Sequence, residues 1–302
     1  MSTIDISRVP KQWPNRQYSQ SLLCDGMDWH FQFCKNQDPQ AKLLVLIHGT
    51  GSSSHSWHKI FPALAKNYTV IAVDLPGHGF TLGAQKSQLD VLHMAKSLKN
   101  LFQTLKLSSP YAIIGHSAGA NCALALNLLT KTPAKIIGLN PSLVPLPNFY
   151  NNFLGPLLHP IATSGFMASF LASSISITGV IDTLLDSTNS KLSEEQRKLY
   201  RLLFKEQSHV YGSMNFMVSS HISELLSNSS KIKTQHTFLV AAQDPWVPQL
   251  TLLPAIQKFF PKAIVKIEDG GHLFHEVNPT RTLEIIFEAL QSTQSSTTPS
   301  YA

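Results

Sequence analysis

Hydrophobic residues along the chain alternate between short continuous runs and longer stretches with helical spacing. The runs Leu43–Ile47 and Thr69–Val73 are apolar at almost every position, which is typical of strands buried on both faces of a sheet. Further strands are predicted at residues 111–114, 134–139, 237–241 and 263–267, with an opening hairpin at 19–24 and 29–34. Helical spacing predicts helices at residues 57–66, 89–105, 118–129, 249–260 and 280–290. This alternation predicts the α/β class, with a mostly parallel sheet flanked by helices.

Residues 141–233 interrupt the alternation and predict an insertion. No Asp, Glu, Lys or Arg occurs between Ile136 and Ile181. We therefore expect a helical cap over an apolar pocket, inserted into a core formed by residues 1–140 and 234–291. The cap residues expected to line the pocket are Phe149, Tyr150, Phe153, Phe166 and Phe170. Two other interpretations stay open: a patch that contacts a membrane, and short helices that only pack on the core.

Composition limits the partners and the location of the protein. Only 14% of the 302 residues are charged, and the basic residues behind the net charge of +6 are scattered along the chain. This pattern disfavours nucleic-acid binding, while attraction to an acidic partner or an anionic membrane surface stays open. Three cysteines are too few for a disulfide framework, and the first residues lack the apolar segment of a signal peptide. We expect a cytoplasmic protein whose polar residues 292–302 form a disordered tail.

The strongest chemical signal is Gly115-His116-Ser117-Ala118-Gly119, which lies between a predicted strand and a predicted helix. This is the G-x-S-x-G pattern in the strand–turn–helix context that it requires. Small residues allow a sharp turn that raises the Ser117 hydroxyl above the sheet edge, and the following helix directs its N-terminal dipole at developing negative charge. We therefore predict that Ser117 is a nucleophile.

A serine nucleophile needs a base that is held by a third group. Asp244 and His272 each follow a predicted strand, which places both at the same sheet edge as Ser117. They are the predicted acid and base. Three alternatives stay open: Asp244 could only cap a helix, His275 could replace His272, and Glu268 or Asp269 could be the acid. Asn140, which follows the strand at 134–139, cannot serve as a carboxylate.

The loop after Leu43–Ile47 reads His48-Gly49-Thr50-Gly51 and is the predicted source of an oxyanion hole. The expected donors are the N–H groups of Thr50 and Ala118. His48 is interpreted as a structural hydrogen-bonding residue and residues 74–79 as a tight turn. No G-x-x-x-x-G-K-[ST], H-E-x-x-H or C-x-x-C pattern occurs, so neither a metal ion nor a cofactor is expected.

Taken together, these segments resemble the α/β-hydrolase superfamily over nearly the whole chain. Serine at position 117, where haloalkane dehalogenases and epoxide hydrolases carry aspartate, argues against those branches. A closer likeness is to the magnesium-chelatase accessory proteins of bacteriochlorophyll biosynthesis. It rests on Trp13-Pro14-Asn15-Arg16, His55-Ser56-Trp57, residues 74–81, Leu139-Asn140-Pro141 and Gly271-His272-Leu273 followed by His275-Glu276, and it departs at Trp246. The resemblance implies a role near magnesium insertion into a tetrapyrrole and a contact with magnesium chelatase.

These observations lead to three functional hypotheses. The first is a serine hydrolase that cleaves an ester or similar acyl bond of a bulky apolar substrate through an acyl-enzyme. The second is a non-catalytic accessory protein that binds a tetrapyrrole or the chelatase. The third is a carbon–carbon bond hydrolase that uses the same three residues. The triad-compatible residues favour an enzyme, because a pure scaffold needs none of them.

Overall fold

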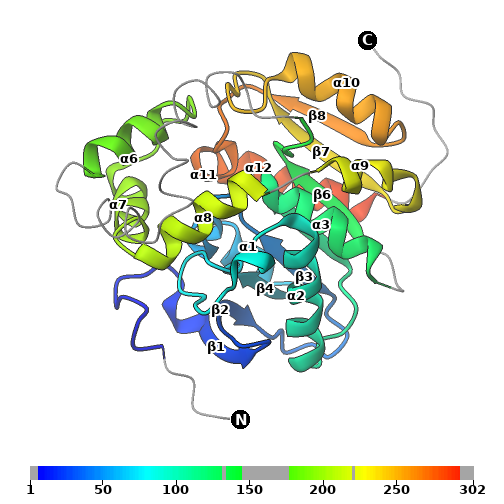
Figure 1. Cartoon of the computed structure of the whole chain (residues 1–302). Coiled ribbons are helices and arrows are strands. Elements are labelled where there is room, and N and C mark those ends of the chain that lie inside the picture. Colours follow the sequence, from blue (N-terminus) through cyan, green and yellow to red (C-terminus); the bar gives the residue numbers. More distant parts are fainter. Residues whose placement is uncertain (1–5, 131–133, 145–176, 220–221, 293–302) are drawn as a thin grey trace.

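An eight-stranded sheet forms the centre of the computed structural model, which describes residues 6–130, 134–144, 177–219 and 222–292 (Figure 1). The strands lie in the order β1-β2-β4-β3-β5-β6-β7-β8. Their bounds are β1 Ser19–Cys24, β2 Met27–Cys34, β3 Leu43–Ile47, β4 Thr69–Val73, β5 Ala112–His116, β6 Lys135–Leu139, β7 His236–Ala241 and β8 Ile264–Glu268. The pairs β1–β2 and β2–β4 are antiparallel, and the pairs from β4 to β8 are parallel. The predicted α/β class is therefore confirmed.

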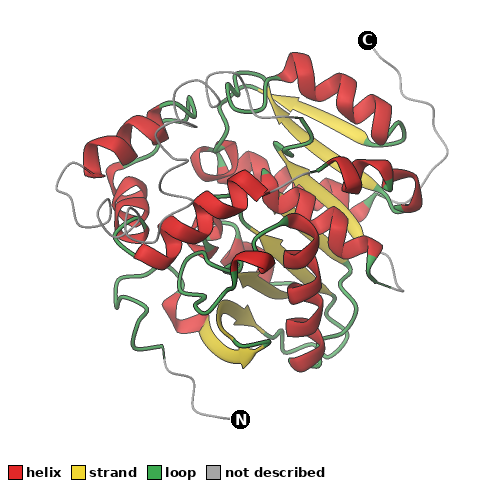
Figure 2. Cartoon of the chain, viewed as in Figure 1, coloured by secondary structure: helices red, strands yellow, loops and turns green. Residues whose placement is uncertain are grey.

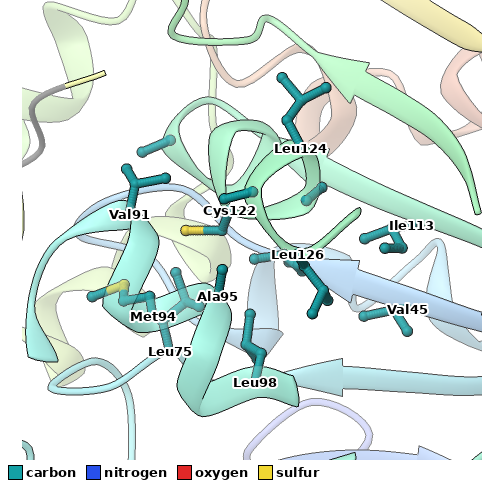
Figure 3. Close-up of a cluster of buried hydrophobic side chains, with 14 of the residues drawn as sticks. Val45, Leu75, Val91, Met94, Ala95, Leu98, Ile113, Cys122, Leu124 and Leu126 are labelled. Carbon is teal, nitrogen blue, oxygen red and sulfur yellow. The ribbon is translucent and has the colours of Figure 1, made fainter. Parts of the chain in front are cut away.

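Helices cover both faces of the sheet (Figure 2). Their bounds are α1 Phe61–Ala65, α2 Val91–Thr104, α3 Ala118–Leu128, α6 Ile177–Asp186, α7 Glu194–Leu203, α8 Gln207–Ser219, α9 Ser223–Ser227, α10 Gln249–Phe259, α11 Phe274–Val277 and α12 Pro279–Gln291. Alternate residues of β3 divide between the two layers: Val45 and Ile47 pack under α2 and α3, whereas Leu44 and Leu46 pack under α1 and α12. Figure 3 shows part of the first layer, where α2 and α3 meet over the sheet.

One predicted helix differs from the structure. Residues 57–66 were expected to form a single helix, but the chain forms a 3-10 helix at Ser54–Trp57 and then the short α1. Pro62 explains the break, because proline lacks a backbone N–H and is accommodated only in the first turn of a helix. The other predicted helices and strands are found with ends shifted by a few residues.

Helices α6, α7 and α8 lie between β6 and β7 in the sequence and group together on the left in Figure 1. They form a third apolar cluster with Trp13, Phe80 and Leu273 of the surrounding loops. The contact between α8 and the loop after β4 is close, because a Cβ on Gly212 would lie 2.0 Å from the carbonyl oxygen of Gly77. Phe149, Tyr150, Phe153, Phe166 and Phe170 lie outside the described residues, as does most of the predicted tail.

No helix in the described part of the chain combines the length and the hydrophobicity needed to cross a bilayer.

Candidate active site

Ser117 lies between the end of β5 and the first residue of α3, in the strained turn that the motif predicts. Its backbone angles are φ 51° and ψ −122°, which are unusual for a residue with a side chain. The turn is held from the neighbouring strand, because the Ser117 N–H donates to the Leu139 carbonyl at 2.9 Å. The strain is thus built into the sheet edge, where it projects the hydroxyl away from the core.

The two glycines of the motif are required by backbone packing. A Cβ on Gly115 would lie 2.5 Å from the carbonyl oxygen of Gly119. A Cβ on Gly119 would lie 2.3 Å from the carbonyl oxygen of His48. Both distances are far below van der Waals contact, so any side chain there would push α3 away from β5 or from the loop after β3.

Asp244 and His272 meet Ser117 in one hydrogen-bonded chain. His272 Nε2 lies 3.0 Å from Ser117 Oγ, and His272 Nδ1 lies 2.7 Å from Asp244 Oδ2. A carboxylate can only accept, so the tautomer that satisfies both contacts carries its proton on Nδ1 and accepts from Ser117 at Nε2. The three residues follow β5, β7 and β8, whose parallel carboxyl ends share one sheet edge.

The Asp244 carboxylate is stabilised in its charged form. Burial alone would raise its pKa, but His272 and the N–H groups of Val247 and Trp246 outweigh burial and lower the pKa below its ordinary value. Those N–H groups donate to Oδ1 at 3.0 Å and 2.8 Å. Asp244 therefore caps its own loop with one oxygen and contacts His272 with the other.

Of the alternatives, His275 packs against other rings, Glu268 pairs with an arginine, and Asp269 is exposed. Both imidazole nitrogens of His275 are buried, and its ring centroid lies 4.2 Å from that of His116, where burial lowers the His275 pKa well below its ordinary value. Glu268 pairs with Arg281 at 2.8 Å. Asn140 donates to the His272 carbonyl at 2.9 Å and accepts from the Ala241 N–H at 2.8 Å. It therefore links the backbone at His272 to the end of β7.

The loop after β3 supplies Thr50 to the same pocket that Ser117, Ala118 and His272 line. The prediction for His48 is confirmed, because its buried ring accepts from the Leu75 N–H at 3.0 Å and its Nδ1 lies 2.8 Å from the Gly49 carbonyl. Residues 74–79 are also architectural: Asp74 accepts from the N–H groups of Ser54 and Phe80. The oxyanion role of Thr50 and Ala118 stays a prediction.

The pocket wall is mainly apolar and was not identified from the sequence. It includes Leu184, Leu185, Phe204, Met217, Trp246 and Leu273. The Trp246 ring stacks on the His272 ring, with centroids 5.7 Å apart and an interplanar angle of 21°. One sequence signal could have located α7, which carries Tyr200 and ends before Phe204. It is the Ser-x-x-Gln capping box formed by Ser193 and Gln196 at the start of this helix.

A buried polar group closes one side of the pocket. Tyr200 lines the pocket, its hydroxyl donates to Glu276 Oε1 at 2.5 Å, and it lies 3.3 Å from Ser52 Oγ. Burial raises the pKa of Glu276 to about 8, although the bond from Tyr200 opposes the shift. Glu276 is therefore neutral at pH 7 and joins α11 to α7 without placing a charge beside the site.

Glu276→Gln is expected to change how stability depends on pH. Between pH 4.5 and about 8 the unfolded chain loses the Glu276 proton while the folded protein keeps it, so wild-type stability falls as pH rises. The variant lacks this loss, and its unfolding free energy relative to wild type should increase from pH 5 to 8 by on the order of a few kcal/mol. Urea unfolding of both proteins from pH 5 to 8 measures this difference in unfolding free energy. Glu224→Gln at an exposed site is the control, and parallel curves for Glu276→Gln would contradict the assignment.

A metal site is not evident in the part of the chain that the structure describes, where no three His, Cys, Asp or Glu side chains are grouped to hold an ion.

Known proteins share both the sequence pattern and the fold. The model of the alpha/beta hydrolase family matches residues 44–285. The chain belongs to this family. Among its relatives, the magnesium-chelatase 30 kDa subunit of Rhodobacter capsulatus is 32% identical over 280 residues, which cover 91% of this chain and 95% of the relative.

Solved structures of other proteins share the architecture at low identity. The enol-lactonase of Burkholderia xenovorans LB400 has a TM-score of 0.73 at 16% identity, covering 90% of this chain and 100% of its own. A putative lipase of Acinetobacter baumannii AYE has a TM-score of 0.72 at 18% identity, covering 91% of this chain and 94% of its own. These likenesses establish the alpha/beta hydrolase fold for this chain.

Proposed function

We propose that this alpha/beta hydrolase is a serine hydrolase that cleaves an ester or similar acyl bond of a bulky apolar substrate. The observation that carries the proposal is the hydrogen-bonded chain Ser117–His272–Asp244 at the floor of an apolar pocket. A serine hydroxyl is a weak nucleophile until an oriented base accepts its proton, and this chain supplies the base and its orienting carboxylate.

The mechanism follows from the positions of the atoms. Ser117 Oγ attacks the substrate carbonyl carbon while its proton passes to His272 Nε2, and Asp244 stabilises the imidazolium that forms. The oxygen that becomes negative accepts from the N–H groups of Thr50 and Ala118 at the start of α3. His272 then protonates the leaving alcohol, and an acyl-enzyme remains. Water repeats the sequence with His272 as base and releases the acid and Ser117.

The substrate class follows from the walls of the pocket. Leu184, Leu185, Phe204 and Met217 offer apolar contacts, and Glu276 adds no charge at pH 7 because its pKa is raised to about 8. A largely apolar acyl or alkyl group is the ligand that loses least solvation there. Phe149, Tyr150, Phe153, Phe166 and Phe170 are proposed to extend this wall, and contact of the same aromatic segment with a membrane is the alternative.

A fluorophosphonate probe and a series of p-nitrophenyl esters test the proposal. The probe is expected to modify Ser117 in the folded protein, as located by peptide mass analysis. The value of kcat/KM should rise by about fourfold for each added CH₂ until the pocket is filled, from about 0.8 kcal/mol of burial. Folded protein that is not modified would refute the serine hydrolase. Modification with rates independent of chain length would refute the apolar substrate alone.

A second candidate concerns pathway and partner, and likeness to the Rhodobacter capsulatus magnesium-chelatase 30 kDa subunit over 95% of that protein favours it. We propose that the chain acts in the cytoplasm beside magnesium chelatase, with a tetrapyrrole as ligand or substrate. Equilibrium binding of magnesium protoporphyrin and its methyl ester tests this role. Binding without probe modification would support the non-catalytic accessory protein, and cleavage of a carbon–carbon bond in place of an ester would support the third hypothesis.

A further inference from the structure

The short turn at residues 187–190, between α6 and α7, contacts the two loops that carry the acid and the base. It comes from the insertion, more than 50 positions before Asp244 and more than 80 before His272 in the sequence. Thr188 and Ser190 are buried, and Asn189 is exposed with a positive φ of 53°. The contacts of this turn fall on both sides of the Asp244–His272 pair.

On the acid side, the turn holds the residues that flank Asp244. Trp246 Nε1 donates to the Ser187 carbonyl and lies as close to Ser187 Oγ, both at 3.1 Å. Asn189 Nδ2 donates to the Gln243 carbonyl at 3.1 Å. Since the Trp246 ring stacks on His272, its anchored indole also limits rotation of the imidazole.

On the base side, the turn holds His272 itself. The His272 N–H donates to the Thr188 carbonyl at 2.9 Å, and the Leu273 N–H donates to Ser190 Oγ at 2.9 Å. The approach is so close that a Cβ on Gly271 would lie 2.1 Å from the Asn189 carbonyl oxygen. Glycine immediately before His272 is therefore the residue that permits the contact.

We propose that the turn 187–190 is a positioning element, so that the insertion, and not the sheet alone, sets the distance between Asp244 and His272. The last pair of β7 and β8 is Ala241 with Glu268. Two backbone bonds of 2.9 Å follow it, from the Ala242 N–H to the Glu268 carbonyl and from the Gln243 N–H to the Gly270 carbonyl, and the loops then extend to Asp244 and His272. The turn bonds to both loops where they leave the sheet. Its catalytic consequence rests on the serine hydrolase function proposed above, whereas its effect on the Asp244–His272 hydrogen bond does not.

Ser190→Ala tests the base side, with Ser190→Thr as the conservative rescue. Alanine leaves the buried Leu273 N–H without its acceptor, and we expect kcat for a short ester to fall by about tenfold while KM changes by less than about twofold. Threonine keeps the oxygen and should restore kcat. Loss of the bond from Leu273 should also weaken the low-field NMR resonance of the proton between His272 Nδ1 and Asp244. This resonance is assigned by its absence from the spectrum of the His272→Ala variant.

Asn189→Gly tests the acid side with little risk to folding, because glycine accepts a positive φ. We expect a smaller fall in kcat, about threefold, since this hydrogen bond is exposed. Asn15→Gly is the matched control: Asn15 also has a positive φ of 57° and donates to a backbone carbonyl, that of His58, at 3.0 Å. Its kcat and its low-field resonance should match wild type.

The outcomes separate this inference from the function. If Ser190→Ala and Asn189→Gly fold, keep wild-type kcat and keep the low-field resonance, the turn does not position the pair and the inference is wrong. If the wild-type protein has no esterase activity but Ser190→Ala loses the resonance and Ser190→Thr keeps it, the positioning role stands and the proposed function fails.

Discussion

Ser117→Ala is expected to lower kcat for esters by on the order of 10⁶, the loss found when the nucleophile of a serine triad is removed. The substitution deletes one oxygen from a residue that lines the pocket and keeps the Cβ atom. Alanine has the same backbone preferences at φ 51° as serine to a first approximation, so the fold should persist. Ester hydrolysis by the purified variant measures the effect, and thermal unfolding checks the fold.

The matched control is Ser227→Ala. The Ser227 hydroxyl also donates to a single acceptor, the Glu224 carbonyl at 2.8 Å, but it lies on α9 away from the pocket. Activity should match wild type. Substantial ester hydrolysis or probe modification in Ser117→Ala would mean that another residue is the nucleophile.

Asp244→Asn is expected to lower kcat by about 10⁴, as the equivalent change does in a well-studied triad protease. The structure gives the reason. Two backbone N–H groups, from Trp246 and Val247, donate to Oδ1, so the asparagine carbonyl oxygen must take that position. Its NH₂ group then faces His272 Nδ1, which must accept. The histidine proton moves to Nε2, and a protonated Nε2 can no longer accept the proton of the Ser117 hydroxyl.

Asn140→Ala is the comparison for this prediction. Asn140 contacts the His272 backbone carbonyl and not the imidazole ring, so its loss should disturb position without reversing the tautomer. We expect a much smaller fall in kcat, measured with the same ester series. Equal losses in Asp244→Asn and Asn140→Ala would reopen the assignment of the acid.

The turn that carries Ser117, between β5 and α3, could be predicted from sequence because most of its context is local. Gly115 is small because it packs on the first turn of α3, and the apolar run before it predicts the strand. The reason for Gly119 is not local, since it packs against the His48 carbonyl after β3. The closeness of Asp244 and His272 to Ser117 could be predicted for a related reason. In a parallel sheet, each residue that follows a strand emerges at the same edge, so order along the chain predicts proximity in space.

The helix expected at residues 57–66 shows where local spacing is insufficient. Its apolar positions are buried as expected: Trp57, Phe61 and Leu64 all pack against β3 and β4. Pro62 nevertheless divides the segment, because the missing N–H prevents one continuous helix. The apolar pattern predicted which side chains are buried. Backbone hydrogen bonding determined that they lie on a 3-10 helix and a short α-helix and not on one continuous helix.

By itself, the sequence of this alpha/beta hydrolase determined the sheet, the turn that carries Ser117 and the order in which Asp244 and His272 follow. Those features depend on periodicity, on small residues at a turn and on strand order. Only the tertiary structure decided that Tyr200 contacts Glu276 and Ser52, and that residues 187–190 bond to the loops that carry Asp244 and His272. Such contacts join segments that are tens of residues apart, and no local periodicity records which polar groups will meet when the insertion packs on the core.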